Sequence, residues 1–417
     1  MRFLFTCVGG PGHLNPLLPI SRAVADAGHT VLWATSDALR GLVERAGFPF
    51  HRLGAVAGTT TSRERTPLVA PDREVSDSEV RENFARRGTR ARLPLVQPLV
   101  DDWRPDVVVC DEFDFASVIA AERRGIPHAT VLVTAAGTQL RPEVVAGPLG
   151  EIRAELGLPA DPDLLAPARY LRLSPFPPSF RAPDSRLHNT DHDIRPPIPD
   201  AVPRAARPSV YFTLGTEFGP ESGDLVERVL AGVRDLPVDV LATVGRHLDP
   251  AGFGPQPAHV RIERYVAQDE VLSRCAAVVS HGGSGTVLGA LAHGLPHLVL
   301  PLGADQPANA ERCAELGAGL TLDAATATPD DVRTAVARLL AEPAFRRAAE
   351  RLRAELAALP GPEHAAALLD RLGRTGRPDY AWVAVSCPDE DDPAPPASWH
   401  ARRRREPGSP CRCAPGG

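Results

Sequence analysis

The stretch Ala276-Ala-Val-Val-Ser-His281-Gly-Gly-Ser-Gly-Thr286-Val-Leu-Gly-Ala-Leu-Ala-His293 predicts a strand, a tight turn and a helix in direct succession. Residues 276–280 form a short apolar run, which is typical of a buried strand. The glycines after His281 allow the backbone to turn sharply and to approach a ligand closely. Residues 287–293 suit a helix. The stretch therefore predicts a buried strand that leads straight into a helix.

The same alternation of strands and helices runs through two long parts of the chain. In the first part, strands are expected at 3–8, 30–34, 107–110 and 129–133, with helices at 17–27, 37–46 and 115–124. In the second part, strands are expected at 210–214, 238–243, 276–280 and 297–300, with helices at 224–234, 285–293, 308–316, 329–340, 343–359 and 363–372. Such alternation predicts two α/β halves, each a doubly wound parallel sheet with helices on both faces.

Composition shifts suggest where these halves begin and end. Prolines are dense from 174 to 208, which is typical of a linker. The expected division is an N-terminal Rossmann-like domain at 1–190, a linker at 191–208 and a C-terminal Rossmann-like domain at 209–373. Residues 374–417 carry charge blocks and prolines, so a disordered tail is expected there. The segment 55–90 breaks the alternation and is expected to be a mobile surface region.

Composition also excludes several classes of protein. The chain has 417 residues, of which 43% are apolar, so it can form two cores, yet no apolar run is long enough to predict a membrane span. The net charge of −6 argues against a nucleic-acid partner. Seven scattered cysteines are expected to be reduced thiols, and the N-terminal apolar run fits a buried strand better than a signal peptide. A cytoplasmic location is therefore expected.

The turn after the strand at 276–280 has the features of an anion site. A helix start presents unpaired N–H groups and the positive end of the helix dipole, and a diphosphate suits both. His281 adds a donor and Thr286 a hydroxyl. The alternative is a glycine-rich turn in which Ser284 or Thr286 only caps the helix.

A second loop, at 301–310, follows the next strand and opens at the same edge of the sheet, where ligands of such sheets bind. Asp305 and Gln306 in this loop offer acceptors and donors suited to sugar hydroxyls. The alternative for Asp305 is an N-cap of the following helix.

Three separated motifs together resemble the donor signature of the family 1 glycosyltransferases. They are Tyr265-Val266-Ala267-Gln268, His281–Thr286 and Asp305-Gln306, and the resemblance extends from Arg2 to about Leu372. These enzymes have the GT-B fold, two Rossmann-like domains facing a central cleft, and use nucleotide diphosphate sugars. One departure is Ala267, where the family usually has proline.

The resemblance assigns donor-binding residues to three parts of the donor. The base would be held by Tyr265 and Val266, by ring stacking and backbone contacts respectively, and Gln268 belongs to the same motif. The sugar hydroxyls would be held by Asp305 and Gln306. The diphosphate would be held by the glycine-rich turn and by a second turn at Gly215-Thr216; in the first turn the residues are His281, Gly283, Ser284, Gly285 and Thr286.

A second histidine lies in the loop after the first strand, in Gly9-Gly-Pro-Gly-His13-Leu-Asn-Pro16. A dinucleotide fingerprint is disfavoured because Asn15 stands where a third glycine belongs. The run is instead similar to the Gly-His-x-x-Pro motif of the same transferases, in which the histidine is the general base. Asp111 matches the aspartate that pairs with this histidine. Asp114 is a rival partner, and Asp111 could alternatively be an N-cap.

The resemblance implies a single displacement with inversion at the anomeric carbon and no required metal or cofactor. The acidic groups at 111–114, 191–193 and 389–392 are accordingly expected to be solvated. Within the family, the lysine-free, arginine- and proline-rich composition suits an actinomycete enzyme that glycosylates a small hydrophobic natural product such as a polyketide. A thymidine diphosphate deoxysugar is preferred over a uridine diphosphate hexose, and attack through carbon rather than oxygen stays open.

Because the chain starts directly at its first strand, it is expected to work without an activator protein. Two other functions stay open. A sugar-nucleotide epimerase of related fold would act without an acceptor, whereas a catalytically silent helper protein would release no nucleotide.

Overall fold

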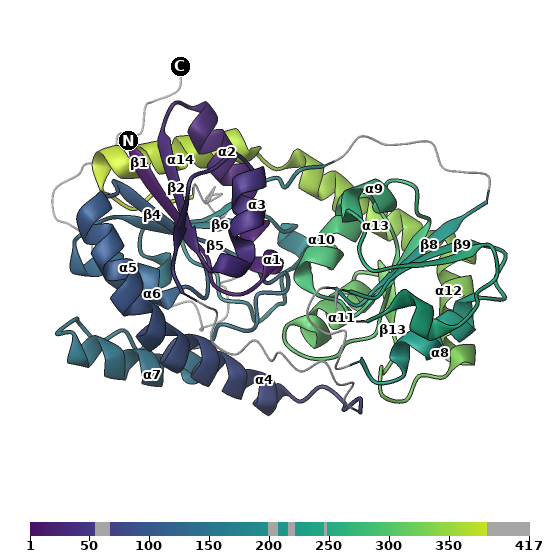
Figure 1. Ribbon diagram of the computed structural model, residues 1–417. Coiled ribbons are helices and arrows are strands. Elements are labelled where there is room, and N and C mark those ends of the chain that lie inside the picture. The colour runs from purple at the N-terminus through teal and green to yellow at the C-terminus, as the bar shows by residue number, and fades with distance from the viewer. Residues whose placement is uncertain (55–66, 199–206, 216–221, 246–247, 382–417) are drawn as a thin grey trace, which may run out of the picture. The chain divides into compact units, whose positions relative to one another are not determined.

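The computed structural model describes residues 1–54, 67–198, 207–215, 222–245 and 248–381, and two parallel sheets organise them (Figure 1). Within these ranges the first sheet has the order β3-β2-β1-β4-β5-β6-β7 and the second has the order β10-β9-β8-β11-β12-β13. Counted within each sheet, both begin with the order 3-2-1-4-5-6 of doubly wound folds. The predicted fold class is therefore confirmed.

The first sheet is built from the N-terminal part of the chain. Its strands are β1 (Arg2–Thr6), β2 (Thr30–Thr35), β3 (Phe50–Arg52), β4 (Val107–Asp111), β5 (His128–Val131), β6 (Leu171–Ser174) and β7 (Asp191–Asp193). The helical segments of this part are α1 (Pro11–Leu14), α2 (Leu18–Asp26), η1 (Asp37–Leu39), α3 (Arg40–Arg45), α4 (Arg73–Glu79), η2 (Val80–Gly88), α5 (Thr89–Trp103), α6 (Phe115–Arg123), α7 (Pro142–Glu155), η3 (Ala166–Ala168) and η4 (Pro178–Phe180).

Both faces of this sheet are apolar because its central strands are buried on both sides. Phe3 and Phe5 point to the face that α2 and α3 cover, while Leu4 points to the face that α5 and α6 cover (Figure 1). The neighbouring strand keeps the same alternation, since Phe3 pairs with Val107 and Leu4 with Val108. Continuous apolar runs in the sequence thus mark the central strands.

The second sheet follows the same plan. Its strands are β8 (Ser209–Thr213), β9 (Asp239–Thr243), β10 (Val260–Glu263), β11 (Ala277–Ser280), β12 (His297–Val299) and β13 (Gly319–Thr321). Its helical segments are α8 (Leu225–Val233), η6 (Pro250–Phe253), α9 (Gln268–Leu272), α10 (Ser284–Ala292), α11 (Gln306–Glu315), α12 (Pro329–Ala341) and α13 (Pro343–Ala358). Val210 and Phe212 pack under α8 and α12, and Tyr211 packs on the opposite face beside α9 and α10.

The last described helix, α14 (Pro362–Thr375), packs in the first core although it follows the second sheet in sequence. Leu368, Leu369 and Leu372 join the cluster that contains Phe3 and Phe5. The expected domain boundaries remain a prediction, but a boundary at 373 does not separate the two cores. Most of the expected tail lies outside the described residues.

The expectation of a mobile surface region at 55–90 is wrong for its second half, while 55–66 lie outside the described residues. Residues 73–88 are helical, and the Asp72 carboxylate caps α4 by accepting from the Glu74 N–H at 2.7 Å. The segment η2 is a π-helix that buries Val80 and Ala85. The arginines of this segment favoured a loop when only the sequence was considered. In the structure they include Arg86, which forms an ion pair with Glu151 on α7.

The expectation of solvated acidic groups is wrong for those that the structure describes. Asp191 pairs with Arg172 at 2.6 Å on neighbouring strands, and Asp193 pairs with Arg181. Asp111 and Asp114 are buried. Residues 389–392 lie outside the described part of the chain. The thiols at positions 7, 110, 275 and 313 are buried and free, as expected, and no helix in the described ranges is both long and apolar enough to cross a bilayer.

Candidate active site

Each sheet has one point where the strand order reverses, and a crevice forms there between loops that leave in opposite directions. In the first sheet this point lies between β1 and β4, and in the second between β8 and β11. His13 follows β1 and Asp111 ends β4. Gly215 follows β8 and His281 follows β11. The four predicted positions therefore lie in pairs at the two reversal points.

His13 and Asp111 are hydrogen-bonded to each other. The distance from His13 Nδ1 to Asp111 Oδ1 is 3.2 Å, so Nε2 is the ring nitrogen left for a substrate. Asp111 is fully buried and also accepts from the backbone N–H groups of Val8 and Phe113 at 2.7 and 2.8 Å. These bonds fix the carboxylate, and the carboxylate in turn fixes the imidazole.

The environment of His13 favours its protonated form. Burial lowers the pKa of His13, but the negative charge of Asp111 and the hydrogen bond to it raise this pKa, and the net shift is upward. The charges of Glu112 and Asp305 act in the same direction. An imidazole placed in this way accepts a proton readily and holds it.

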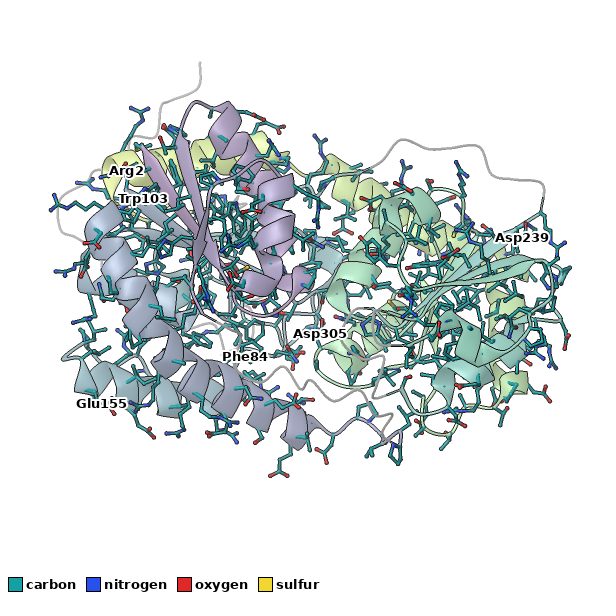
Figure 2. The ribbon with its side chains drawn as sticks, viewed as in Figure 1. Arg2, Phe84, Trp103, Glu155, Asp239 and Asp305 are labelled. Carbon is teal, nitrogen blue, oxygen red and sulfur yellow. The ribbon has the colours of Figure 1, made fainter. Side chains whose placement is uncertain are left out.

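Two aromatic rings enclose His13, and the sequence did not single out either of them. Phe84 of η2, which is labelled in Figure 2, stacks on the imidazole with a centroid distance of 6.0 Å. Phe113 contacts the imidazole edge-on at 5.5 Å. Phe84 and Phe113 also touch each other. In the sequence, Phe113 is only weakly marked, by its place in the acidic stretch 111–114 after a strand. Nothing near Phe84 in the sequence marks that residue. Apolar aromatic side chains thus border the imidazole of His13.

Asp114 does not share the role of Asp111. Its carboxylate caps α6 by accepting from the Ser117 N–H at 3.2 Å, and it pairs with the Arg92 guanidinium at the same distance. Arg92 also donates to the backbone oxygen of Cys7. Asp114 is therefore a buried structural group.

The glycine-rich turn is constrained by close packing. Gly282 has φ +87°, and a Cβ there would lie 2.5 Å from a methyl of Val299. The ring of His281 lies against Gly215 and Gly283, since a Cβ at either position would come within 2.8 Å of it. Glycine is thus required where the backbone turns and where the ring packs.

Burial lowers the pKa of His281 to about 4, although a hydrogen bond to the Thr213 backbone raises it. The ring is therefore neutral at neutral pH. It can approach a diphosphate only as a hydrogen-bonding group, and the positive charge at this corner comes from the α10 dipole. Thr286 is buried in the first turn of that helix, and Gly285 beside it has no side chain to cover the N–H groups.

The predicted sugar-binding residues also make bonds inside the protein. Asp305 accepts from the Ser284 N–H at 3.2 Å and from the Ser284 hydroxyl. Gln306 accepts from the backbone N–H groups of Leu302 and Gly303 at 2.7 and 3.2 Å. Asp305 thus stabilises the start of α10, and the amide oxygen of Gln306 shapes its own loop.

The predicted base-binding motif precedes α9. Tyr265 is 70% exposed, so its ring face is open for stacking. Ala267 has φ −60°, the value that proline would impose, so the backbone keeps its shape without the proline. The amide nitrogen of Gln268 is buried and has no hydrogen-bond partner among the described residues. Val266 is half-buried, and Thr216 lies outside the described residues.

Two doubly wound sheets, with a supported imidazole at one reversal point and a glycine-rich helix start at the other, have the arrangement expected of a nucleotide-sugar-dependent transferase. Comparisons with known proteins agree: the family described as "Erythromycin biosynthesis protein CIII-like, C-terminal domain" matches residues 227–372. The chain belongs to the family 1 glycosyltransferases with the GT-B fold, among those of actinomycete natural-product biosynthesis.

Relatives match over almost the whole chain. L-demethylnoviosyl transferase of Streptomyces niveus is 33% identical, with 87% of this chain and 96% of the relative covered. Tylactone mycaminosyltransferase of Streptomyces fradiae is 31% identical, with coverage of 89% and 92%. The crystal structure of glycosyltransferase VinC in complex with DTDP is 26% identical, with coverage of 90% and 100% and a TM-score of 0.71. The predicted family and enzyme class are confirmed.

The first prediction concerns the glycine-rich turn. Gly282→Ala should weaken thymidine diphosphate binding at least about tenfold, because left-handed backbone costs a residue with a Cβ about 1–2 kcal/mol and the methyl group would displace Val299. Titration calorimetry measures the affinity. Gly150→Ala, in α7 where a Cβ meets no atom within 4 Å, is the matched control. Unchanged affinity in a folded Gly282→Ala protein would contradict the expected role of the turn.

The second prediction separates Asp114 from Asp111. Asp114→Ala should lower the free energy of unfolding by about 3–5 kcal/mol, because it leaves the Arg92 guanidinium buried without its ion partner. Urea unfolding followed by circular dichroism measures the change. Asp330→Ala removes an exposed ion pair with Arg333 and should change stability little. Equal stability of the two variants would show that the buried pair contributes nothing.

Proposed function

We propose that this glycosyltransferase moves a hexose, in an inverting reaction, from a thymidine diphosphate sugar to a hydroxyl of a small hydrophobic natural product, with His13 as the general base. The observation that carries the proposal is the 3.2 Å contact between His13 Nδ1 and the fully buried Asp111. A histidine without a carboxylate partner would have no group to fix its ring or to stabilise its protonated form. A fixed imidazole with one nitrogen left for substrate has the geometry of a general base.

In the proposed step, His13 Nε2 takes the proton of the acceptor hydroxyl as the oxygen attacks the anomeric carbon. The bond from that carbon to the diphosphate oxygen breaks, and Asp111 stabilises the imidazolium that forms. A direct displacement of this kind inverts the anomeric configuration. The negative charge on the departing diphosphate grows at the start of α10, where the N–H groups and the helix dipole stabilise it. This chemistry needs no metal.

The proposed nature of the two substrates is supported by relatives and by the surroundings of His13. VinC is described as bound to DTDP, and a relative of Streptomyces peucetius is described as TDP-daunosamine transferase. These names support a thymidine diphosphate donor. The half-buried ring of Phe84 beside His13 favours an apolar, ring-containing acceptor, because aromatic faces stack on such surfaces.

The third prediction tests the base. His13→Ala should lower kcat/KM for glycosyl transfer at least about a hundredfold, because general-base catalysis contributes this much or more. Thymidine diphosphate affinity should stay the same, since the diphosphate site lies in the second sheet. His51→Ala, at an exposed position on β3, is the control. Transfer at the parental rate in His13→Ala would rule out the proposed base.

The fourth prediction concerns pH. Only neutral His13 can accept a proton, so kcat/KM should fall as the pH drops through its raised pKa. Asp111→Asn removes the charge that raises this pKa while burial continues to lower it. The acid limb of the profile should therefore move to lower pH, and the plateau should drop by about a hundredfold or more because the imidazolium loses its partner. A pH profile of kcat/KM measures both, and an acid limb that does not move would refute the coupling.

A further inference from the structure

Asn309 lies on α11, one turn after Asp305, and is completely buried. Its side-chain nitrogen carries two hydrogens and lies within hydrogen-bond distance of three acceptors: the backbone oxygen of Gly282 at 2.9 Å, Asp305 Oδ2 at 2.8 Å and Ser284 Oγ at 3.1 Å. A carbonyl oxygen and a carboxylate can only accept, so the nitrogen of the carboxamide has to face them. Asn309 thus ties the glycine-rich turn to the loop that carries Asp305.

The oxygen of the same carboxamide is also used. It accepts from the Ala136 N–H at 3.1 Å, and the neighbouring Ala135 N–H donates to Ser284 Oγ at 2.6 Å. The N–H groups just before them, of Val133 and Thr134, both donate to Glu112 Oε1 at 2.8 Å. Glu112, the residue after Asp111, is thus linked to Asn309 through these hydrogen bonds and the backbone from Val133 to Ala136.

These contacts determine how Asp305 is oriented. All three of its bonds to Ser284 and Asn309 end on Oδ2. They hold Oδ2 in place, so Oδ1, which bonds to no other residue in the described ranges, is the oxygen that can accept from an incoming hydroxyl. Without Asn309, the Ser284 contacts alone would hold a carboxylate that can rotate about its side-chain bonds. The sugar would then meet an acceptor in several orientations rather than one.

We propose that Asn309 is a positioning residue of the donor site, which holds the Asp305 carboxylate in the orientation that receives the sugar. This inference rests on the proposed sugar-binding role of Asp305. Asn309 does not touch the sugar itself. Its loss should therefore weaken the sugar-dependent part of donor affinity more than the part that comes from the nucleotide diphosphate.

Calorimetry with thymidine diphosphate and with thymidine diphosphate glucose tests this difference. The quantity to compare is the ratio of the two dissociation constants, since a general loss of stability would weaken both ligands alike. Asp305→Ala and Asn309→Ala should each lower the affinity for the sugar nucleotide about tenfold more than that for thymidine diphosphate, as expected for a hydrogen bond to a charged group. Asn189→Ala, an exposed asparagine, is the matched control and should keep both affinities.

A double mutant distinguishes positioning from an independent effect. If Asn309 acts through Asp305, adding Asn309→Ala to Asp305→Ala should not change the ratio further. Asn309→Leu keeps the approximate size of the side chain but removes its donors and its acceptor without adding a charge beside Asp305, so it gives the same readout should the alanine variant fail to fold.

Three results would overturn the inference. If Asp305→Ala shifts the ratio and both Asn309 variants leave it unchanged, the proposed role of Asp305 stands and that of Asn309 falls. If the two single changes add fully in the double mutant, Asn309 acts independently of Asp305. If Asp305→Ala leaves the ratio unchanged, the proposed sugar contact is wrong and Asn309 has nothing to position.

Discussion

The reversal of strand order in each sheet is the constraint on which the site depends. Parallel strands need crossover connections, and these connections are right-handed. The connection that follows β1 and the connection that follows β4 must therefore cover opposite faces of the first sheet. The carboxyl ends of these two strands therefore border a crevice. His13 and Asp111 are far apart in sequence, but the register of the sheet places them at this crevice. In the second sheet, the same arrangement brings the turn at Gly215 beside His281.

The groups around the two histidines then give them opposite protonation behaviour, although burial lowers the pKa of both. His13 has a buried carboxylate as its partner, so its pKa is raised and it can carry a proton during the reaction. Burial is the largest influence on the pKa of His281 and outweighs the hydrogen bond to the Thr213 backbone, which raises this pKa, so the ring stays neutral. The same residue type is suited to proton transfer at one crevice and to hydrogen bonding at the other. Among the groups that raise the pKa of His13, Asp111 contributes most, and the charges of Glu112 and Asp305 add to it.

Sequence patterns predicted both sheets, the family and the position of His13 and Asp111, because central strands are continuous apolar runs and the site residues directly follow them. The helices from Arg73 to Gly88 were missed because an arginine- and glutamate-rich surface has the composition of a loop until its ion-pair partners are known. Phe84 was missed because it lies in this segment, which was expected to be a mobile surface region. Asn309 lies in the loop at 301–310 that the sequence singled out, but its role depends on four contacts from three separate segments. No local pattern contains that information.

The return of α14 to the first sheet has a consequence for how the chain is made. Leu368, Leu369 and Leu372 of α14 fill part of the core around Phe3 and Phe5. One side of that core therefore stays uncovered until α14 has been synthesised. During synthesis from the amino terminus, the first half would leave the ribosome with an apolar surface uncovered, while the second half could complete its own sheet earlier. The part of the protein that is translated first would thus be the last to become fully packed.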